Sequence, residues 1–302
     1  MAMLAAGRPT DWRRVTAEER RSGFAALMRM AGRAPPVAGT EAVAVAGGAG
    51  RLAARLYRPA GEPSGPRPGL VYFHGGGLVA GDLDTHDVLC RSLAAGSGCR
   101  ILAVDYRRPP EHRFPAATDD AEAALAEALD GAAAFGLDPA RVAVGGDSAG
   151  ATLAVVAAAA LRGRPGPGPA LQLLLCPVLD VAPGTDSRRA FASGHLLDAE
   201  MMARDLADYL PEAADRADPR LSPLRIADLA GLPPALVHTA AFDPLRDEGA
   251  LFAGRLAAAG VPVEHRCHGG MIHHFYGLTG FIPAARTIVE EIARGLGAAL
   301  TA

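Results

Sequence analysis

Lysine is absent from the sequence, so arginine supplies all of its 30 basic residues. Without a lysine amine, the chain has no residue for Schiff-base chemistry and no lysine general base. Neither sign of charge is in large excess, because 33 acidic residues leave a formal net charge of −3. This balance gives no electrostatic reason to expect a nucleic-acid partner or an anionic membrane surface as a partner.

Cysteine is scarce, and no two of the 4 cysteines have C-x-x-C spacing. The spacing therefore predicts neither a zinc site nor a redox motif, and we expect no metal site. We interpret Cys90, Cys99, Cys176 and Cys267 as free thiols in a reducing compartment. Cys176 and Cys267 lie in apolar runs, which predicts that both are buried.

Long apolar runs are also lacking. No stretch reaches the about 18 uncharged apolar residues that a membrane span requires. The apolar segment 1–6 is too short for a signal peptide and is followed at once by charged residues. The sequence therefore predicts a cytoplasmic protein without a membrane span.

Short apolar segments alternate with helical segments along most of the chain. Alternating residues on both sides of the glycine-rich run 47–50 predict a hairpin over 41–57. Further strands are predicted at 70–74, 101–105, 141–145, 171–176, 234–239 and 261–267, and helices at 11–33, 115–134, 149–162, 244–259 and 283–300. This alternation predicts an α/β fold with a mostly parallel central sheet and helices on both faces.

Residues 183–215 interrupt this alternation, because they carry charged residues, Met and Tyr at helical spacing between two strands. We expect this insertion and residues 1–40 to form a small helical cap over the carboxyl ends of the strands. The core would then consist of residues 41–182 and 216–302. A cap in this position would act as a substrate lid.

The segment 142–150 contains an apolar strand, the sequence Gly-Asp-Ser-Ala-Gly and the start of a small-residue helix. In a G-x-S-x-G turn the serine lies at a sharp strand-to-helix turn with a strained backbone, and the flanking glycines leave room for it. The pattern predicts Ser148 as a nucleophile. The alternative is an ordinary glycine-rich turn, which the strand before and the helix after disfavour.

Three consecutive glycines, Gly75, Gly76 and Gly77, follow His74 at the end of an earlier strand. Such a run frees backbone N–H groups to face a ligand, and fixed donors stabilise the negative charge of a tetrahedral intermediate. We expect Gly76, Gly77 and Ala149 to be the oxyanion donors, with Gly75 making the turn and His74 holding the loop. A flexible loop is the alternative.

The segment 268–275 closes the last predicted strand and contains several histidines. His273 lies in the turn beyond the strand, where its side chain can reach Ser148, and we favour it over His274 as the base. Asp243 follows the preceding strand and is the predicted orienting acid, with a helix N-cap as its alternative role. The chain order Ser148, Asp243, His273 is the order that an α/β-hydrolase sheet produces.

These segments resemble the hormone-sensitive-lipase family of bacterial esterases and lipases (bacterial family IV) over nearly the whole chain. The matching blocks are HGGG at 74–77, DYRRPPEH at 105–112, GDSAG at 146–150, DPLRD at 243–247 and GMIH at 270–273. The resemblance implies an α/β-hydrolase fold, a carboxylesterase for short acyl chains, a two-part cap, no cofactor and often a homodimer. It implies the same triad and the same oxyanion donors.

The chain departs from the family pattern at His274, where the family usually has glycine, and at Arg108 and Pro109, where it usually has leucine and alanine. These differences concern substrate preference. Pocket walls are expected from both the core and the cap, at Leu78, Asp147, Met201, Met202 and His274, with Trp12, Phe24 and Leu196 near them. For each apolar member, ordinary core packing is the alternative.

The expected partner is a small-molecule ester. The same triad also serves amide or carbamate hydrolases and deacylases dedicated to one metabolite, and only the pocket distinguishes these from an esterase. A non-catalytic small-molecule receptor is a further reading of the same scaffold, which the complete triad disfavours.

Overall fold

The computed structural model describes residues 10–61, 65–182 and 184–301. The prediction that residues 1–6 are not a signal peptide lies outside the described residues. Among the helices that are described, none has both the length and the apolar character needed to cross a bilayer.

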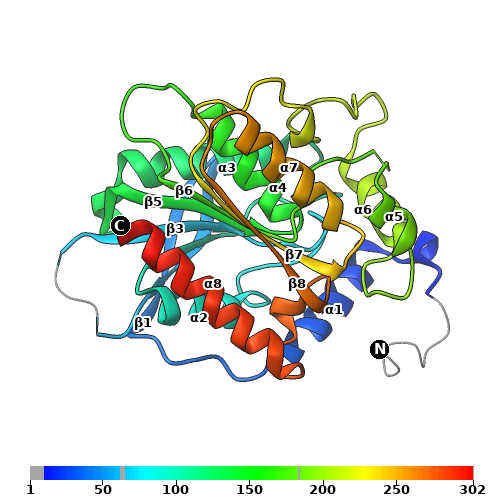
Figure 1. Ribbon diagram of the computed structural model, residues 1–302, viewed down its shortest axis with the longest axis horizontal. Coiled ribbons are helices and arrows are strands. Elements are labelled where there is room, and N and C mark those ends of the chain that lie inside the picture. The colour runs from blue at the N-terminus through cyan, green and yellow to red at the C-terminus, as the bar shows by residue number, and fades with distance from the viewer. Residues whose placement is uncertain (1–9, 62–64, 183, 302) are drawn as a thin grey trace.

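A single twisted sheet forms the centre of the described chain (Figure 1). Its strands are β1 (Gly39–Gly47), β2 (Gly50–Arg58), β3 (Arg67–Phe73), β4 (Arg100–Val104), β5 (Leu137–Asp147), β6 (Leu171–Leu175), β7 (Ala235–Phe242) and β8 (Val263–Ile272), in the spatial order β1-β2-β4-β3-β5-β6-β7-β8. β1 pairs antiparallel with β2, and β2 antiparallel with β4, while the other neighbours are parallel. The predicted α/β fold and the predicted hairpin are confirmed.

Helices cover both faces of the sheet (Figure 1). The helices α2 (Asp87–Ser97) and α8 (Pro283–Thr301) pack on one face, and α3 (Ala116–Asp130), α4 (Ala149–Ala160) and α7 (Arg246–Ala258) on the other. Successive side chains of a strand point to opposite faces. Leu70 and Val71 of β3 therefore belong to different core clusters, and both are fully buried.

A third group of helices lies beyond the carboxyl ends of the parallel strands (Figure 1). It comprises α1 (Ala17–Met28), α5 (Asp186–Ala190) and α6 (Ala199–Tyr209). The sequence predicts one helix over 11–33, but the regular helix begins only at Ala17, because Thr16 and Glu19 form a capping box. It is flanked by short 3₁₀ segments at Trp12–Arg14 and Arg29–Ala31. Other described 3₁₀ segments lie at Ala132–Phe135, Pro223–Arg225 and Phe275–Gly277.

Two further details of the fold differ from the sequence-based expectation. The helix α2 was not predicted, because Ser92, Gly96 and Ser97 lower its intrinsic helix propensity, and packing against α8 stabilises it instead. Cys267 is exposed, although its apolar surroundings predicted burial. The reason is the position of β8 at the edge of the sheet, where residues 264–267 are all exposed.

The central position of β6 gives a stability prediction. Leu173 is fully buried between neighbouring strands and a covering helix layer, so Leu173→Ala leaves a cavity and is expected to lower the free energy of unfolding by about 2–5 kcal/mol. Leu251→Ala on α7 is the matched control, because Leu251 is 53% exposed, and it is expected to change stability by less than about 0.5 kcal/mol. Urea unfolding of the two variants checks this, and equal losses would contradict the assignment of the core.

Candidate active site

Ser148 occupies the turn between β5 and α4 and has a strained backbone, with φ 52° and ψ −120°. The turn is possible only because its flanking residues have no side chains. A Cβ placed on Gly146 or on Gly150 would overlap the carbonyl oxygen of Phe73 in β3. The sharp turn therefore presents the Ser148 side chain at the carboxyl edge of the sheet.

Three loops at this edge bring Ser148, His273 and Asp243 together. His273 follows β8 and Asp243 follows β7. The His273 Nε2 atom lies 3.0 Å from Ser148 Oγ, and His273 Nδ1 lies 2.8 Å from Asp243 Oδ2. The other oxygen of Asp243 accepts the backbone N–H of Leu245 at 2.8 Å, which fixes the carboxylate. Because a carboxylate only accepts, Nδ1 carries the proton and Nε2 offers its lone pair to Ser148.

The glycine loop after β3 lies beside Ser148. Gly76 and Gly77 have φ values of 116° and 67°, which favour glycine. In the part of the chain that the structure describes, the backbone N–H groups of Gly76, Gly77 and Ala149 donate no hydrogen bond to protein. Gly75 does not line the cavity, and its N–H donates instead to Asp147 Oδ1 at 2.9 Å. The three free donors are therefore available to an oxygen atom next to Ser148.

His74 holds this loop from below. The Tyr106 hydroxyl donates to the His74 carbonyl oxygen at 2.7 Å, and the two rings stack with centroids 4.3 Å apart. The His74 Nδ1 atom lies 2.9 Å from the carbonyl oxygen of Gly75. The loop that carries the free donors is thus fixed by both side-chain and backbone contacts.

Asp147 is not a pocket residue, contrary to the sequence-based expectation. Its carboxylate is fully buried beneath the glycine loop, because the turn at Ser148 directs the preceding side chain inward. Tyr72 donates to Asp147 Oδ1 at 2.6 Å, the His86 Nε2 atom lies 3.3 Å from the same oxygen, and His274 Nδ1 lies 3.6 Å from Oδ2. Burial by itself raises the pKa of Asp147, but the rings of His86 and His274 and the Tyr72 hydroxyl hold it well below its ordinary value.

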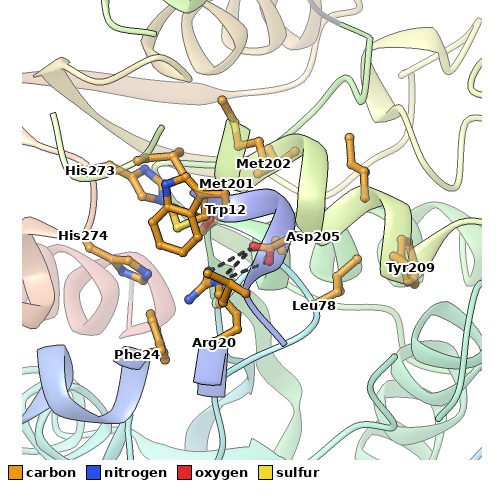
Figure 2. Close-up of a pocket in the computed structure, with 18 of the residues that line it drawn as sticks. Trp12, Arg20, Phe24, Leu78, Met201, Met202, Asp205, Tyr209, His273 and His274 are labelled. Carbon is orange, nitrogen blue, oxygen red and sulfur yellow. Dashed lines mark hydrogen bonds and ion pairs between the residues drawn. The ribbon is translucent and has the colours of Figure 1, made fainter. Parts of the chain in front are cut away.

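A cavity of about 620 Å³ opens in front of these groups, between the sheet edge and the helices beyond it (Figure 2). Ser148, His273 and the three free donors lie in its wall. The other expected pocket residues also line it, namely Leu78, Met201, Met202 and His274, together with Trp12, Phe24 and Leu196. Most of the lining is apolar, so the cavity suits a small organic molecule.

Arg20 and Asp205, which the sequence did not single out, form a buried ion pair in the cavity wall (Figure 2). Helical spacing offered a signal for both residues. Arg20 precedes Phe24 by four positions and Asp205 follows Met201 by four, so each shares a helix face with an expected pocket residue. The pairing itself joins two segments far apart in the chain, which no local pattern reports.

Cys176, Asp243 and His273 are the group among the described residues whose donor atoms are close enough for a metal ion, within 4.8 Å of one another. Two of these side chains already hydrogen-bond to each other. Burial raises the pKa of the Cys176 thiol well above its ordinary value, which keeps it protonated and a weak ligand. The arrangement therefore fits a hydrogen-bonded triad better than a metal site.

A family model described as alpha/beta hydrolase fold, Abhydrolase_3, matches residues 70–277. The chain belongs to this family. The carboxylic ester hydrolase LipN of Mycobacterium tuberculosis is 46% identical over 242 residues, which are 78% of this chain and 64% of LipN. The matched part thus spans a little less than two thirds of LipN.

Two further comparisons cover more of the related protein. An ethyl acetate hydrolase of Pseudomonas putida is 40% identical over 81% of this chain and 76% of its own length. A second comparison is with the structure of an ester hydrolase from the metagenome of Lake Arreo, which is in complex with a bipyridine phosphonate derivative. The two structures superpose with a TM-score of 0.94 at 42% sequence identity, and the match covers 100% of this chain and 96% of that chain. The expected resemblance is confirmed, and this α/β-hydrolase is a carboxylesterase.

The contact between Tyr72 and Asp147 gives a kinetic prediction. Tyr72→Phe removes a hydrogen bond to the carboxylate that holds the glycine loop, and is expected to lower kcat about tenfold, or ~1.4 kcal/mol, with KM changed less than about threefold. Tyr276→Phe is the matched control, because the buried Tyr276 hydroxyl has no partner among the described residues. Steady-state kinetics checks this, and equal kcat values in the two variants would contradict it.

Burial also holds several histidines in the neutral form. Burial, aided by the neighbouring ring, lowers the pKa of His74 beside His86 and of His238 beside His268 to about 3. Burial and the adjacent His273 lower the pKa of His274 well below its ordinary value. These groups stay uncharged in the folded protein over a pH range in which an unfolded chain binds protons.

Acid is therefore expected to destabilise the fold. An unfolded histidine takes up a proton near a pKa of about 6.5, whereas folded His238 does so only near 3, so the unfolded state binds more protons in between. The free energy of unfolding is expected to fall from pH 6.5 toward pH 4, and His238→Gln to reduce that slope by up to about 1.4 kcal/mol per pH unit. Urea titrations at several pH values measure the slope, and an unchanged slope in His238→Gln would contradict the expectation. Activity at pH 7 serves as a control for folding, since His238 does not line the cavity.

Proposed function

We propose that this carboxylesterase hydrolyses short- to medium-chain acyl esters through an acyl-enzyme on Ser148. The observation that carries the proposal is the hydrogen-bonded series Ser148, His273 and Asp243, which opens onto a cavity beside three unpaired backbone donors. Nucleophile, base, orienting acid and oxyanion donors are the groups that ester hydrolysis needs within reach of one carbonyl.

In the proposed mechanism, His273 Nε2 removes the Ser148 proton as Oγ attacks the ester carbonyl carbon. The oxyanion accepts hydrogen bonds from the N–H groups of Gly76, Gly77 and Ala149, of which the last also lies at the positive end of α4. Asp243 stabilises the imidazolium. His273 then protonates the leaving alcohol, and a water molecule activated by the same histidine releases the acid and restores Ser148.

The size and lining of the cavity support a small acyl group. Its volume of about 620 Å³ must hold both arms of the ester, which leaves limited room for a long chain. The similarity to an ethyl acetate hydrolase supports the same preference.

We further propose that residues 1–40 and 183–215 act as the cap, of which residues 1–9 and 183 lie outside the described residues. Two contacts support joint action of the two segments. Trp12 Nε1 donates to Asp198 Oδ2 at 3.3 Å, and an ion pair joins α1 to α6.

The exposed edge of β8 supports a homodimer, since unpaired strand edges pair with other chains. The described cysteines are free thiols, which supports the proposed cytoplasmic location, and the small net charge supports the absence of a nucleic-acid partner.

Hydrolysis of p-nitrophenyl esters from acetate to palmitate tests the proposal. The value of kcat/KM is expected to be highest for short chains, and Ser148→Ala is expected to lower kcat by more than about a thousandfold. Ser92→Ala is the matched control, because Ser92 lies on α2 outside the cavity.

Full activity in Ser148→Ala would contradict the assigned nucleophile. Hydrolysis of anilides or carbamates in place of esters by the folded wild type would indicate the amide or carbamate hydrolase instead. If the folded protein hydrolyses neither esters nor anilides nor carbamates, and does not react with a fluorophosphonate probe, the non-catalytic receptor is favoured.

A further inference from the structure

The ion pair of Arg20 and Asp205 lies inside a cavity that is otherwise mostly apolar. Arg20 Nε donates to Asp205 Oδ1 at 3.1 Å and to Oδ2 at 3.3 Å, and Nη2 donates to Oδ2 at 3.0 Å. The two side chains are 9% and 6% exposed. Figure 2 shows them directed toward each other between Trp12 and Phe24 on one side and Leu78 and Tyr209 on the other.

The pair lies directly against the loop that carries the free backbone donors. A Cβ placed on Gly77 would overlap Asp205 Oδ2, so this carboxylate packs on the Gly77 backbone. A substrate whose carbonyl oxygen accepts the N–H of Gly77 therefore has the ion pair as an immediate neighbour. Arg20, Gly77 and Ser148 line the same cavity, so a polar atom a few bonds from that carbonyl can approach Arg20.

Arg20 keeps hydrogen-bond donors free. A guanidinium has five N–H groups, and Nη1 donates to none of the described residues. The Nη1 atom is also not among the polar atoms that the described residues bury without a partner, so it keeps some exposed surface, and Arg20 lines the cavity. The pair thus offers donors to a substrate while Asp205 balances the charge.

A buried ion pair is weak evidence for a stabilising role, although the Arg20 guanidinium also lies over the Phe24 ring, with its Cζ 5.6 Å from the ring centroid. Burial raises the pKa of Asp205 to about 6 even though Arg20 is hydrogen-bonded to it. The attraction of Arg20 therefore does not offset the loss of water around the carboxylate. Replacing such a buried pair with apolar side chains is often neutral or stabilising, and the neighbouring Phe24 and Met201 would suit an apolar replacement.

We propose that the Arg20–Asp205 pair makes the site selective for esters that carry a second acceptor oxygen, such as an ether, keto or hydroxyl oxygen, close to the scissile carbonyl. An alkyl ester of the same shape buries the free Arg20 donors without an acceptor, which weakens its binding in the transition state. A second oxygen accepts those N–H groups. The proposal rests on the esterase function proposed above and adds the class of substrate.

The test compares two p-nitrophenyl esters of nearly equal shape, methoxyacetate and butyrate. Their kcat/KM ratio is measured for the wild type and for the double variant Arg20→Met/Asp205→Leu, so the intrinsic reactivity of each ester cancels between the two proteins. The ratio of methoxyacetate to butyrate is expected to fall by about tenfold in the double variant. The ester pair 2-methoxyethyl butyrate and butyl butyrate tests the alcohol side in the same way, and a fall with either pair supports the proposal.

Arg14→Met is the matched control, since Arg14 also lines the cavity but is exposed at its edge, and this variant is expected to leave both ratios unchanged. Ratios within twofold of the wild type in the folded double variant would overturn the proposal. If the wild type hydrolyses none of these esters, the proposed esterase function fails. That result differs from the one that overturns only the substrate proposal, in which both proteins are active and have the same kcat/KM ratio for the paired esters.

If the double variant does not fold, Asp205→Asn decides. It leaves the Arg20 charge without its counter-charge, so the preference for the methoxy ester is expected to increase severalfold. An unchanged or smaller preference in this variant would overturn the proposal.

Discussion

The close approach of the turn at Ser148 to the loop after β3 is the constraint on which the rest of the site depends. Side chains at Gly146 or Gly150 would overlap the backbone of β3, so the two segments meet only because both residues lack a Cβ. Asp147 then reaches the N–H of Gly75 across the same contact. One contact between backbones therefore sets the Ser148 geometry and the direction of the neighbouring N–H donors together.

Much of the arrangement could be predicted because its signals are local. The serine turn, the glycine loop and the two loops with Asp243 and His273 each lie directly after an apolar strand, and parallel strands end at one edge. The direction of the Asp147 side chain could not be predicted, since it depends on the strained backbone of the next residue. The exposure of Cys267 follows from strand order, which a single sequence does not report.

The pairing of Arg20 with Asp205 could not be predicted from the sequence either, because the two residues are 185 positions apart. Each has an ordinary place on an amphipathic helix, and only their meeting creates a charged group in an apolar cavity. The chemistry of the site thus separates into two parts. In the proposed function, local motifs at the sheet edge carry the reaction, and the proposed role of the Arg20–Asp205 contact is to select the substrate.

Identification of the residue that a fluorophosphonate modifies tests the central claim most directly. The purified protein is labelled with the probe at pH 7, digested, and the modified peptide is sequenced by mass spectrometry. The account predicts one adduct per chain, on Ser148, and loss of that adduct in His273→Ala, because the serine then lacks its base. An adduct on a different residue, or undiminished labelling of Ser148 in His273→Ala, would contradict it.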